Sequence, residues 1–305
     1  MDLTPTNLAL FFTGLKVSFD EGYGMPAPWW NQIAMQVSSD TELETWGWAD
    51  LDSGVMREWL GPRFVHNTAL RSRSLLNKDF EKTKAVPKRK LQDDKYGLYN
   101  SVAKQMGWDA AKLHDQQLAA LILSNPTCFD GKAFFASDHP QNVDRAGDGV
   151  YDNLLGLALT PANFGIARTA MRTFKSRSGQ PMGSEASLLV VPPSLLDMAL
   201  TITQAANIAT LAIGATLTSG DVGTTSNIYQ NSIQILCINE LETEPTAWYL
   251  LDNKGIIKPF LVQVRQEANF VTLNSETDMN VFHNKEYIFG VDSRSAYDVT
   301  LPFKA

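Results

Sequence analysis

The segment from Arg57 to Lys90 is strongly basic and has no clean apolar face, and this combination most restricts how the chain can fold. Ten Lys and Arg residues stand against three acids, so the segment carries +7; because the whole chain carries −7, the remainder carries −14. The basic residues are Arg57, Arg63, Arg71, Arg73, Lys78, Lys82, Lys84, Lys88, Arg89 and Lys90. A cationic segment inside an acidic globular protein usually has a partner of opposite sign. The candidate partners are nucleic acid, a membrane surface and another copy of the chain.

The rest of the composition is that of an ordinary folded protein. With 305 residues, of which 44% are hydrophobic and 19% charged, the chain can bury a sizeable core. Its pI of about 5.2 argues against a dedicated DNA-binding protein. Its two cysteines lack metal-ligand spacing and are expected to be reduced thiols. There is no basic leader and no apolar run of about 18 residues, so we expect a soluble protein, made in the cytoplasm, without membrane contact.

The first 22 residues predict an amphipathic helix. Thr4 is a suitable N-cap, Pro5 suits the first helical position, and large apolar residues follow at helical spacing. A cluster of helix breakers from Gly22 to Pro28 ends the pattern. Because this bend separates the helix from the rest of the chain, we interpret the helix as an arm outside the compact body.

Residues 67–90 predict a two-stranded ribbon that turns near Asn77–Asp79. In the first strand, Arg71 to Ser74 alternate arginine with serine, so neither face is apolar there. A ribbon that is polar on both faces has no core to fix its register, and an isolated hairpin is marginal in water. We therefore expect it to lie on another surface that supplies packing and opposite charge.

A long helical pattern follows over about residues 93–125. Asp93 and Asp94 stand at its start, where acids suit the helix dipole. Gly97 and Gly107 weaken the pattern, so a break is possible. Another helix is expected after Thr160-Pro161, and Ser194 is expected to cap a third.

Strand patterns in the second half complete a mixed α+β architecture without βαβ alternation. They occupy residues 187–191, 233–238, 248–251, 256–262 and 287–291. The segments at 248–251 and 256–262 are expected to pair as a hairpin about Asp252–Gly255. A tight turn is expected at Asp130-Gly131.

No catalytic or cofactor-binding motif stands out. The four histidines form no paired ligand motif, and the chain has no phosphate-binding loop, dinucleotide fingerprint or nucleophile elbow. The most enzyme-like group is Cys128 with Asp138 and His139, a candidate thiolate and base. The simpler interpretation is a buried cysteine beside the exit from a hairpin. We therefore predict no enzyme activity, no cofactor and no metal.

Two further binding hypotheses are weaker than their structural alternatives. Asp93 and Asp94 could hold a cation together with Asp52 or Asp79, although a helix start explains them better. Five tryptophans could stack on bases, but packing or subunit contact is the favoured role. They are Trp29, Trp30, Trp46, Trp48 and Trp59.

Three explanations of the basic stretch remain. It contains no helix-turn-helix, RNP-like or zinc-finger pattern, and Glu58, Asp79 and Glu81 interrupt it, which weakens the hypothesis of a nucleic-acid-binding module using residues 57–90. A solvated face without a partner is the second explanation. Contact with acidic patches on neighbouring copies explains both halves of the charge asymmetry, and we favour it.

Several segments together resemble one known family, the major head subunit of Mu-like phages and prophages. The resemblance extends in order from the N-terminal helix to about residue 265 and is least distinctive over 142–235. The segments are Thr45-Trp46-Gly47-Trp48, Met56-Arg57-Glu58-Trp59-Leu60-Gly61-Pro62-Arg63, Asn77-Lys78-Asp79-Phe80-Glu81-Lys82-Thr83, Asp93-Asp94-Lys95-Tyr96-Gly97-Leu98-Tyr99, Phe129-Asp130-Gly131-Lys132-Ala133-Phe134-Phe135-Ala136-Ser137-Asp138-His139-Pro140, Trp248-Tyr249-Leu250-Leu251-Asp252 and Lys258-Pro259-Phe260.

The resemblance implies the tailed-phage major capsid fold of the Hong Kong 97 type. In that fold an N-terminal arm precedes an extended β-ribbon loop, and a spine helix anchors a peripheral domain beside an axial domain. Applied to this chain, it implies an arm at 1–45, the ribbon loop at 46–92, a peripheral domain with the spine helix at 93–154, an axial domain at 155–235, and return strands to the peripheral domain at 236–305.

The resemblance also implies a function: a head protein that self-assembles into pentamers and hexamers of an icosahedral shell around double-stranded DNA. The implied partners are other copies, with a scaffold or protease, a portal and decoration proteins as further possibilities. The shell would enclose DNA without sequence-specific binding, and assembly would take place in the host bacterial cytoplasm. The expected intersubunit contacts are Arg57, Arg63, Arg71, Arg73, Lys78, Lys82 and Lys84. We also expect residues 68–88 to be dispensable for folding but not for assembly.

Overall fold

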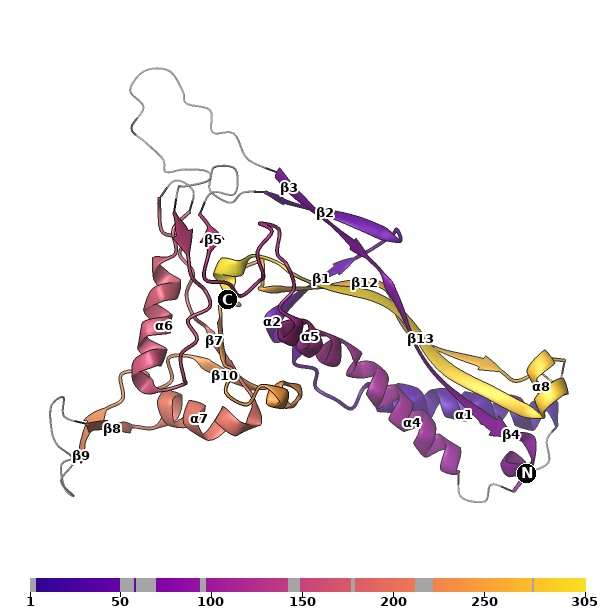
Figure 1. The fold of residues 1–305 in the computed structure, drawn as a ribbon. Coiled ribbons are helices and arrows are strands. Elements are labelled where there is room, and N and C mark those ends of the chain that lie inside the picture. The colour runs from indigo at the N-terminus through magenta and orange to yellow at the C-terminus, as the bar shows by residue number, and fades with distance from the viewer. Residues whose placement is uncertain are drawn as a thin grey trace.

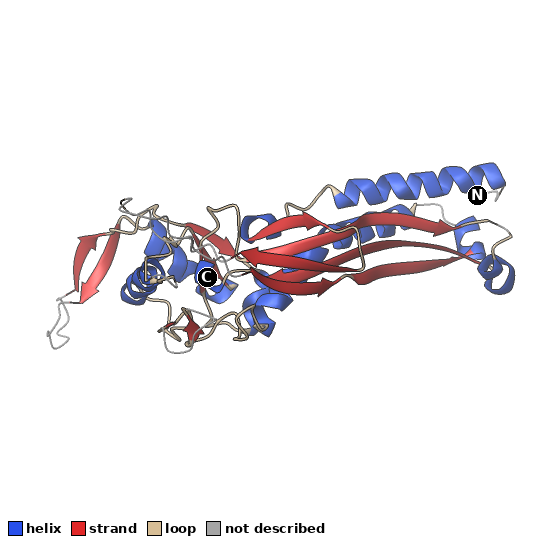
Figure 2. Ribbon diagram, turned by 90° about the horizontal axis from the view of Figure 1, so that it is seen from above, coloured by secondary structure: helices blue, strands red, loops and turns tan. Residues whose placement is uncertain are grey.

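The chain forms an elongated body joined at one end to a smaller group of helices and short strands (Figure 1). The computed structural model describes residues 4–49, 58, 70–93, 97–141, 149–176, 179–211, 222–275 and 277–305. Arg57 and Arg63 therefore lie outside the described residues. Figure 2 shows the strands of the body and helix α1 (Pro5–Tyr23) extending along the same long direction. The predicted mixture of helices and sheets is confirmed.

The body is built on a four-stranded sheet with the order β1-β12-β13-β4. The strands are β1 (Ala34–Ser38), β12 (Phe260–Leu273), β13 (Glu286–Val299) and β4 (Lys78–Pro87). β1 pairs in parallel with β12, and the other neighbours are antiparallel. The strand predicted at 287–291 is confirmed as part of the longer β13. Its register with β12 shifts between Val264 and Asn269, which is typical of a β-bulge and increases the local twist.

β13 joins two cores of the body because its side chains reach both. Tyr287 and Phe289 are fully buried in a cluster with residues of α1 and α4 (Leu98–Ala111), near one end of the sheet. Val299, at the other end of the strand, lies in a second cluster with Phe260. The sheet thus contributes to two separate apolar clusters, and the polar residues Ser295 and Gln263 are buried between its ends.

The predicted hairpin over residues 67–90 is wrong. β3 (Leu70–Leu76) pairs with β2 (Leu43–Ala49), whereas β4 pairs with β13 in the main sheet. Asn77, between β3 and β4, is 5% exposed, and its side-chain amide bonds to buried groups of the body, so the chain passes from one sheet into the other instead of turning back. Because residues 68–88 include most of β4 of the main sheet, we now expect their removal to impair folding as well as assembly.

The N-terminal helix forms as predicted but is not a separate arm. Thr4 is its N-cap, and the hydroxyl accepts a hydrogen bond from the backbone N–H of Asn7 at 3.3 Å. Its apolar stripe, which includes Phe12 and Leu15, is buried against α4 and the main sheet. The helix is therefore part of the core of the body, and the bend that follows redirects the chain into β1.

The long helical pattern is divided into two helices. Asp93 ends the short helix α3 (Lys88–Gln92), and α4 begins after Gly97, whose φ of 64° is left-handed. α5 (Leu113–Ser124) follows after Lys112. The prediction that Asp93 starts the long helix is therefore wrong. The predicted break is present, but it lies at Lys112 and not at Gly107.

The smaller part contains a three-stranded sheet with the order β10-β7-β11. The strands β7 (Leu188–Val191) and β10 (Gln234–Cys237) confirm two predictions. All four residues of β7 are buried, and they alternate between two cores, because Leu188 and Val190 belong to one cluster and Leu189 and Val191 to another. This explains the continuous apolar run in the sequence.

The predicted hairpin about Asp252–Gly255 is also wrong. β11 (Tyr249–Leu251) pairs with β7, whereas β12 pairs with β1 and β13. Leu250 and Phe260 are buried in different clusters, so the connecting segment leads from the smaller sheet to the main sheet.

Short elements complete the described part of the chain. Helix α6 (Pro161–Thr173) begins at Thr160 as predicted, but Ser194 does not cap α7; its hydroxyl bonds to Glu242. The remaining elements are α2 (Trp30–Ile33), β5 (His139–Pro140), β6 (Val150–Tyr151), α7 (Leu196–Gln204), β8 (Asn207–Leu211), β9 (Val222–Ser226) and α8 (Met279–Asn284), with 3-10 turns at Pro193–Leu195, Asn239–Thr243 and Pro302–Lys304. Within the described ranges no helix has the length and apolar character needed to cross a bilayer.

The contact between α1 and α4 yields a stability prediction. A Cβ at Gly107 would lie 2.1 Å from the carbonyl oxygen of Phe19 and 2.8 Å from the backbone nitrogen of Tyr23. Since backbone atoms cannot move aside without separating the helices, we expect Gly107→Ala to lower the free energy of unfolding by about 2 kcal/mol in urea titrations. Gly14→Ala is the control, because a Cβ added at this position of α1 would have no neighbouring atom within 4 Å. It should raise the free energy of unfolding by up to about 1 kcal/mol. Equal effects at the two positions would contradict this packing.

Candidate functional site

The β2–β3 ribbon lies at the edge of the body without a core of its own. The strands pair so that Thr45 lies opposite Ser74 and Trp46 opposite Arg73. The face with Thr45 and Ser74 is exposed, and the two hydroxyls bond to each other at 3.0 Å. The face with Trp46 and Arg73 is half-buried against the main sheet. The predicted polar character is confirmed for Ser72, Arg73 and Ser74, while Leu43 and Leu76 form an exposed apolar pair at the base of the ribbon.

A chain of buried amides fixes the base of this ribbon. The indole Nε1 of Trp46 donates to Oε1 of Gln263 at 2.6 Å, and Nε2 of Gln263 donates to Oδ1 of Asn77 at 2.8 Å. Asn77 in turn donates to the Ser39 hydroxyl at 2.8 Å and the Thr41 carbonyl at 2.9 Å. Gln263 is fully buried, so these bonds tie both strands of the ribbon to the middle of the main sheet.

The turn before β2 is held by one carboxylate. Oε1 of Glu44 accepts from the backbone N–H of Asp40 at 2.8 Å and of Thr41 at 2.9 Å, and from the Ser39 hydroxyl at 3.1 Å. These bonds, with that from the Thr41 N–H the strongest, hold the pKa of Glu44 below its usual value. The turn therefore presents the ribbon in a defined orientation.

Arg73, predicted as an intersubunit contact, is engaged within its own chain. Its Nε lies 2.5 Å from Oδ2 of Asp298 in β13, and its Nη1 donates to the carbonyl of Thr127. Burial raises the pKa of Asp298, and the nearby guanidinium opposes that rise. The ion pair is a second attachment of the ribbon to the main sheet.

The lysines of β4 occupy one face of that strand. By strand alternation Lys78, Lys82 and Lys84 point to the same side, and Asp79 and Glu81 point to the other. Lys82 pairs with Asp109 of α4, and Asp79 lies 3.1 Å from Nε of Arg294. Lys78 and Lys84 are exposed. Arg71 lies in β3, but its side chain is outside the described residues, as are Arg57 and Arg63.

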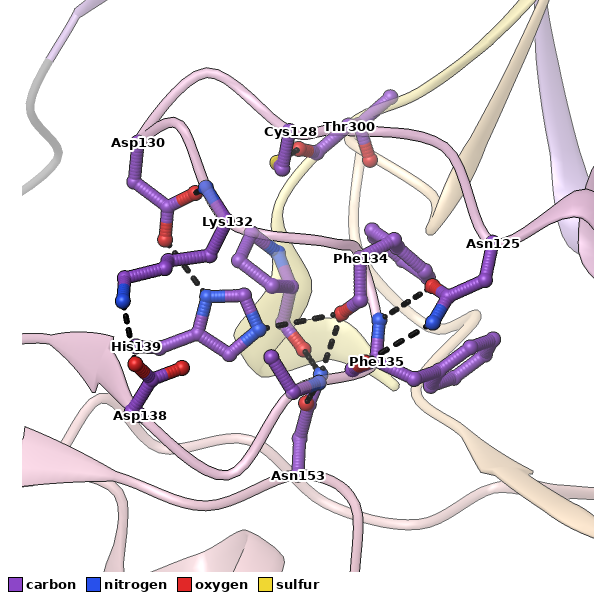
Figure 3. Close-up of polar contacts among 12 residues, drawn as sticks. Asn125, Cys128, Asp130, Lys132, Phe134, Phe135, Asp138, His139, Asn153 and Thr300 are labelled. Carbon is purple, nitrogen blue, oxygen red and sulfur yellow. Dashed lines mark hydrogen bonds and ion pairs between the residues drawn. The ribbon is translucent and has the colours of Figure 1, made fainter.

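The group around Cys128 and His139 is structural (Figure 3). Nδ1 of His139 lies 2.6 Å from Oδ2 of Asp130, and its Nε2 lies 3.2 Å from the Phe134 carbonyl. The Cys128 thiol instead donates to the Thr300 carbonyl at 3.2 Å, and burial raises its pKa to about 12. A thiol with a raised pKa that donates to a backbone carbonyl gives no support to the cysteine nucleophile hypothesis.

Two asparagines complete this network. Asn125 donates to the Phe135 carbonyl at 3.0 Å and accepts from its N–H at 2.8 Å. Asn153 donates to the carbonyls of Phe134 at 2.8 Å and Pro302 at 3.0 Å. The segment with the Asp-Gly turn is thereby fixed against β6 and the end of β13.

Of the other binding hypotheses, the cation site rests on Asp52 and Asp94, which lie outside the described residues. In the described part of the chain no group of three His, Cys, Asp or Glu residues could hold a metal ion. Trp29 and Trp30 pack against a core cluster, and their backbone N–H groups donate to Asp115 at 3.1 and 2.9 Å. Trp46 is engaged by Gln263, while the side chain of Trp48 and the whole of Trp59 lie outside the described residues.

Sequence reasoning missed Gln263 and Asp298, the two residues of the body that hold the ribbon. Gln263 interrupts the otherwise apolar run Leu261-Val262-Gln263-Val264, which is the signal that could have identified it. A polar residue in a run that reads as a buried strand needs a partner.

The sequence has relatives that agree with this architecture. Residues 8–158, 156–241 and 220–302 match the sequence model of the family described as Mu-like prophage major head subunit gpT. The chain belongs to this family. It is 32% identical over 154 residues to the major capsid protein of Escherichia phage Mu, a match that covers 49% of this chain and 50% of the phage Mu protein. It is 22% identical over 298 residues to the Mu-like prophage FluMu major head subunit of Haemophilus influenzae, covering 96% of this chain and 70% of that protein.

Solved structures show the same fold. A chain of the bacteriophage JBD30 procapsid superposes with a TM-score of 0.57 at 22% identity, covering 98% of this chain and 74% of that chain. The virus-like particle of Pyrococcus furiosus gives a TM-score of 0.53 at 12% identity, covering 96% and 97%. The tailed-phage capsid fold of the Hong Kong 97 type is confirmed. None of these matches supports a nucleic-acid-binding module.

The Arg73–Asp298 pair gives a pH-dependent prediction. Arg73→Met leaves a 6% exposed carboxylate side chain without its cation, and we expect a loss of about 2 kcal/mol at pH 7, because Arg73 itself is partly exposed. The folded state holds the proton of Asp298 more tightly than the unfolded state, so protonation favours folding. The loss should therefore shrink as the pH falls towards 4, measured by urea unfolding at both pH values.

Lys84→Met is the matched control for this substitution. It removes an exposed cation from the same basic stretch and should change the free energy of unfolding by less than about 0.5 kcal/mol at either pH. An Arg73→Met loss that is the same at both pH values would show that the ion pair is not its cause.

Proposed function

We propose that the chain is a shell subunit that self-assembles into pentamers and hexamers of an icosahedral phage head around double-stranded DNA. The observation that carries this proposal is a polar ribbon without a core of its own, fixed at its base to a body with the tailed-phage capsid fold. Such a ribbon needs a second surface to pack against, and copies of the same chain supply one.

Charge supports association between copies. The segment 57–90 carries +7 against −14 on the rest of the chain, so the basic segment of one copy is attracted to the remainder of another. Exposed Lys78 and Lys84 are available for such contacts, whereas Arg73 and Lys82 also form ion pairs within the chain. Arg57, Arg63 and Arg71 complete the proposed contact set.

The organisation implied by the family is proposed with the following divisions: an arm at 1–45, a ribbon loop at 46–92, a peripheral domain at 93–154, an axial domain at 155–235 and return strands at 236–305. The name arm here refers only to the order of the parts along the chain, because α1 packs on α4 as part of the body. The chain has no enzymatic role in this proposal.

The further partners follow from the same role. The acidic remainder of the chain gives packaged DNA little specific attraction, so DNA is enclosed and not read. A related JBD30 capsid, 23% identical with a TM-score of 0.53, is decorated with minor capsid protein trimers. We propose that decoration, portal and scaffold or protease partners join the head in the host bacterial cytoplasm, and that the subunit ends in the virion.

A closed ribbon tests the proposal. Ala49 and Leu70 are paired across β2 and β3, so residues 50–69 can be replaced by Asn-Gly, which forms a two-residue hairpin turn. We expect this variant to keep the thermal unfolding midpoint of the parent but to form no shells by negative-stain electron microscopy and sedimentation. The parent should form capsomers or shells under the same conditions.

Two outcomes would contradict the proposal. One is normal shell formation by the closed-ribbon variant, which would exclude the removed segment as an intersubunit element. The other is a parent protein that stays monomeric and shifts DNA at moderate salt, which would restore the nucleic-acid hypothesis. Replacement of Arg57 and Arg63 by Gln removes the positive charge of this segment but keeps its length, so it shows which of the two properties assembly requires.

A further inference from the structure

A small pocket opens beside the junction of α4 and α5, away from the ribbon contacts described above. Its volume is about 160 Å³, and the connection from α1 to α2, the start of α5 and strand β12 line it. The lining residues that matter chemically are Tyr23, Pro26, Pro28, Trp30, His114 and Glu267. At about 30 Å³ per liquid water molecule, this is the room of roughly five waters. It suits one long side chain and is too small for a folded segment.

The inner wall of the pocket is aromatic and uncharged. The rings of Trp30 and His114 meet edge to face with centroids 5.3 Å apart. Nδ1 of His114 lies 2.8 Å from the hydroxyl of Tyr297, which fixes the ring. Burial lowers the pKa of His114 to about 4, so the imidazole is neutral at neutral pH. The wall therefore offers ring faces and edges without positive charge.

The rim of the pocket is anionic. Glu267 is exposed, and its Oε1 accepts from the side-chain amide of Gln36 at 3.5 Å, a long contact. Burial raises the pKa of Tyr23, and the charge of Glu267, which lines the same pocket, adds to that rise. Among the described residues that line the pocket, none is Lys or Arg. The carboxylate therefore lines the pocket with no basic residue among its described neighbours in the lining.

Aromatic rings combined with a carboxylate form a site for an organic cation. Ring faces attract ammonium and guanidinium groups, and the attraction grows as the cation loses its water. The carboxylate adds a charge-assisted hydrogen bond. Two proline rings supply rigid walls along which the methylenes of a long basic side chain can lie.

We propose that this pocket receives a Lys or Arg side chain from the basic stretch 57–90 of a second copy. The proposal rests on the self-assembly proposed above and names one receiving site for it. The occupant follows from charge and size: the stretch carries +7, its exposed members include Lys78 and Lys84, and the pocket holds one side chain. A second copy supplies this cation at every position of a symmetric assembly.

Photo-crosslinking from the rim tests the contact directly. The exposed position Gln36 is replaced by p-benzoylphenylalanine, and shells are assembled from a mixture of isotope-labelled and unlabelled copies. We expect adducts between copies that map to residues 57–90. Shells that form normally but give adducts only elsewhere, or none, would overturn the pocket assignment while leaving the self-assembly proposal intact. A parent that forms no shells would instead overturn self-assembly.

Substitutions measure the contribution of the pocket. Glu267→Gln removes the charge with little change in shape, and Tyr23→Leu removes the ring. Each should raise the protein concentration needed for assembly roughly tenfold. Tyr23→Phe keeps the ring and is the matched control, expected to assemble as the parent does. Unchanged assembly of Glu267→Gln, with a parent-like unfolding midpoint, would overturn the proposal.

Competition by a free organic cation tests whether the pocket is occupied by a side chain of another copy during assembly. Tetramethylammonium chloride should inhibit assembly of the parent more than NaCl at equal ionic strength, because it competes for the pocket. That difference should vanish in Glu267→Gln. If tetramethylammonium promotes assembly or acts as NaCl does, the pocket does not receive a side chain of a second copy.

Discussion

The direction of the β2–β3 ribbon depends on one buried side-chain amide, that of Gln263. Its oxygen accepts from Trp46 in β2, and its nitrogen donates to Asn77 directly after β3, so a single residue of β12 holds both strands. A buried amide that loses its partners costs about 1–3 kcal/mol, and rotation of the ribbon would break both bonds. The ribbon can therefore be polar along its length and still leave the body in one direction. The ion pair between Arg73 and Asp298 reinforces the same junction.

Part of the charge of the basic stretch is engaged in ion pairs within the chain. Arg73 and Lys82 pair with Asp298 and Asp109 of the same chain, while Lys78 and Lys84 are exposed. Strand alternation further separates the lysines of β4 from the acids of that strand. The sum of +7 thus overstates the charge that can reach a partner, although Lys78 and Lys84 are exposed on the same side of β4.

Local signals in the sequence predicted the helices and strands well, but they predicted poorly which strands pair with each other. The N-cap threonines and the apolar run of β7 depend on neighbours in the chain, and all were confirmed. The hairpins predicted about Asn77 and about Asp252–Gly255 failed because these turn-forming residues connect different sheets. The tight hairpin predicted at Asp130-Gly131 is confirmed, with Thr127 bridged to Ala133. The reason lies far away in sequence: the amide of Asn77 is bonded to Gln263, 186 residues later. At the candidate site the basic residues could be found from composition, whereas their partners in the body could not, since only the fold brings Asp298 to Arg73.

A contact between a basic segment and an acidic remainder has a consequence for symmetry. The donating surface and the receiving surface are different parts of one chain, so each copy can give one contact and receive another. Such heterologous contacts do not end in a dimer; they continue until rotation closes a ring. Each contact is polar and partly exposed, and therefore weak alone, with surface ion pairs worth about 0–1 kcal/mol. Closure of the ring makes the last contact intramolecular, so contacts that are weak alone can hold a completed ring together. The same weakness lets a misplaced copy dissociate before the ring closes. A ribbon with an apolar face would bind more tightly but would also trap wrong partners, and this is a physical reason for a polar ribbon in a self-assembling subunit.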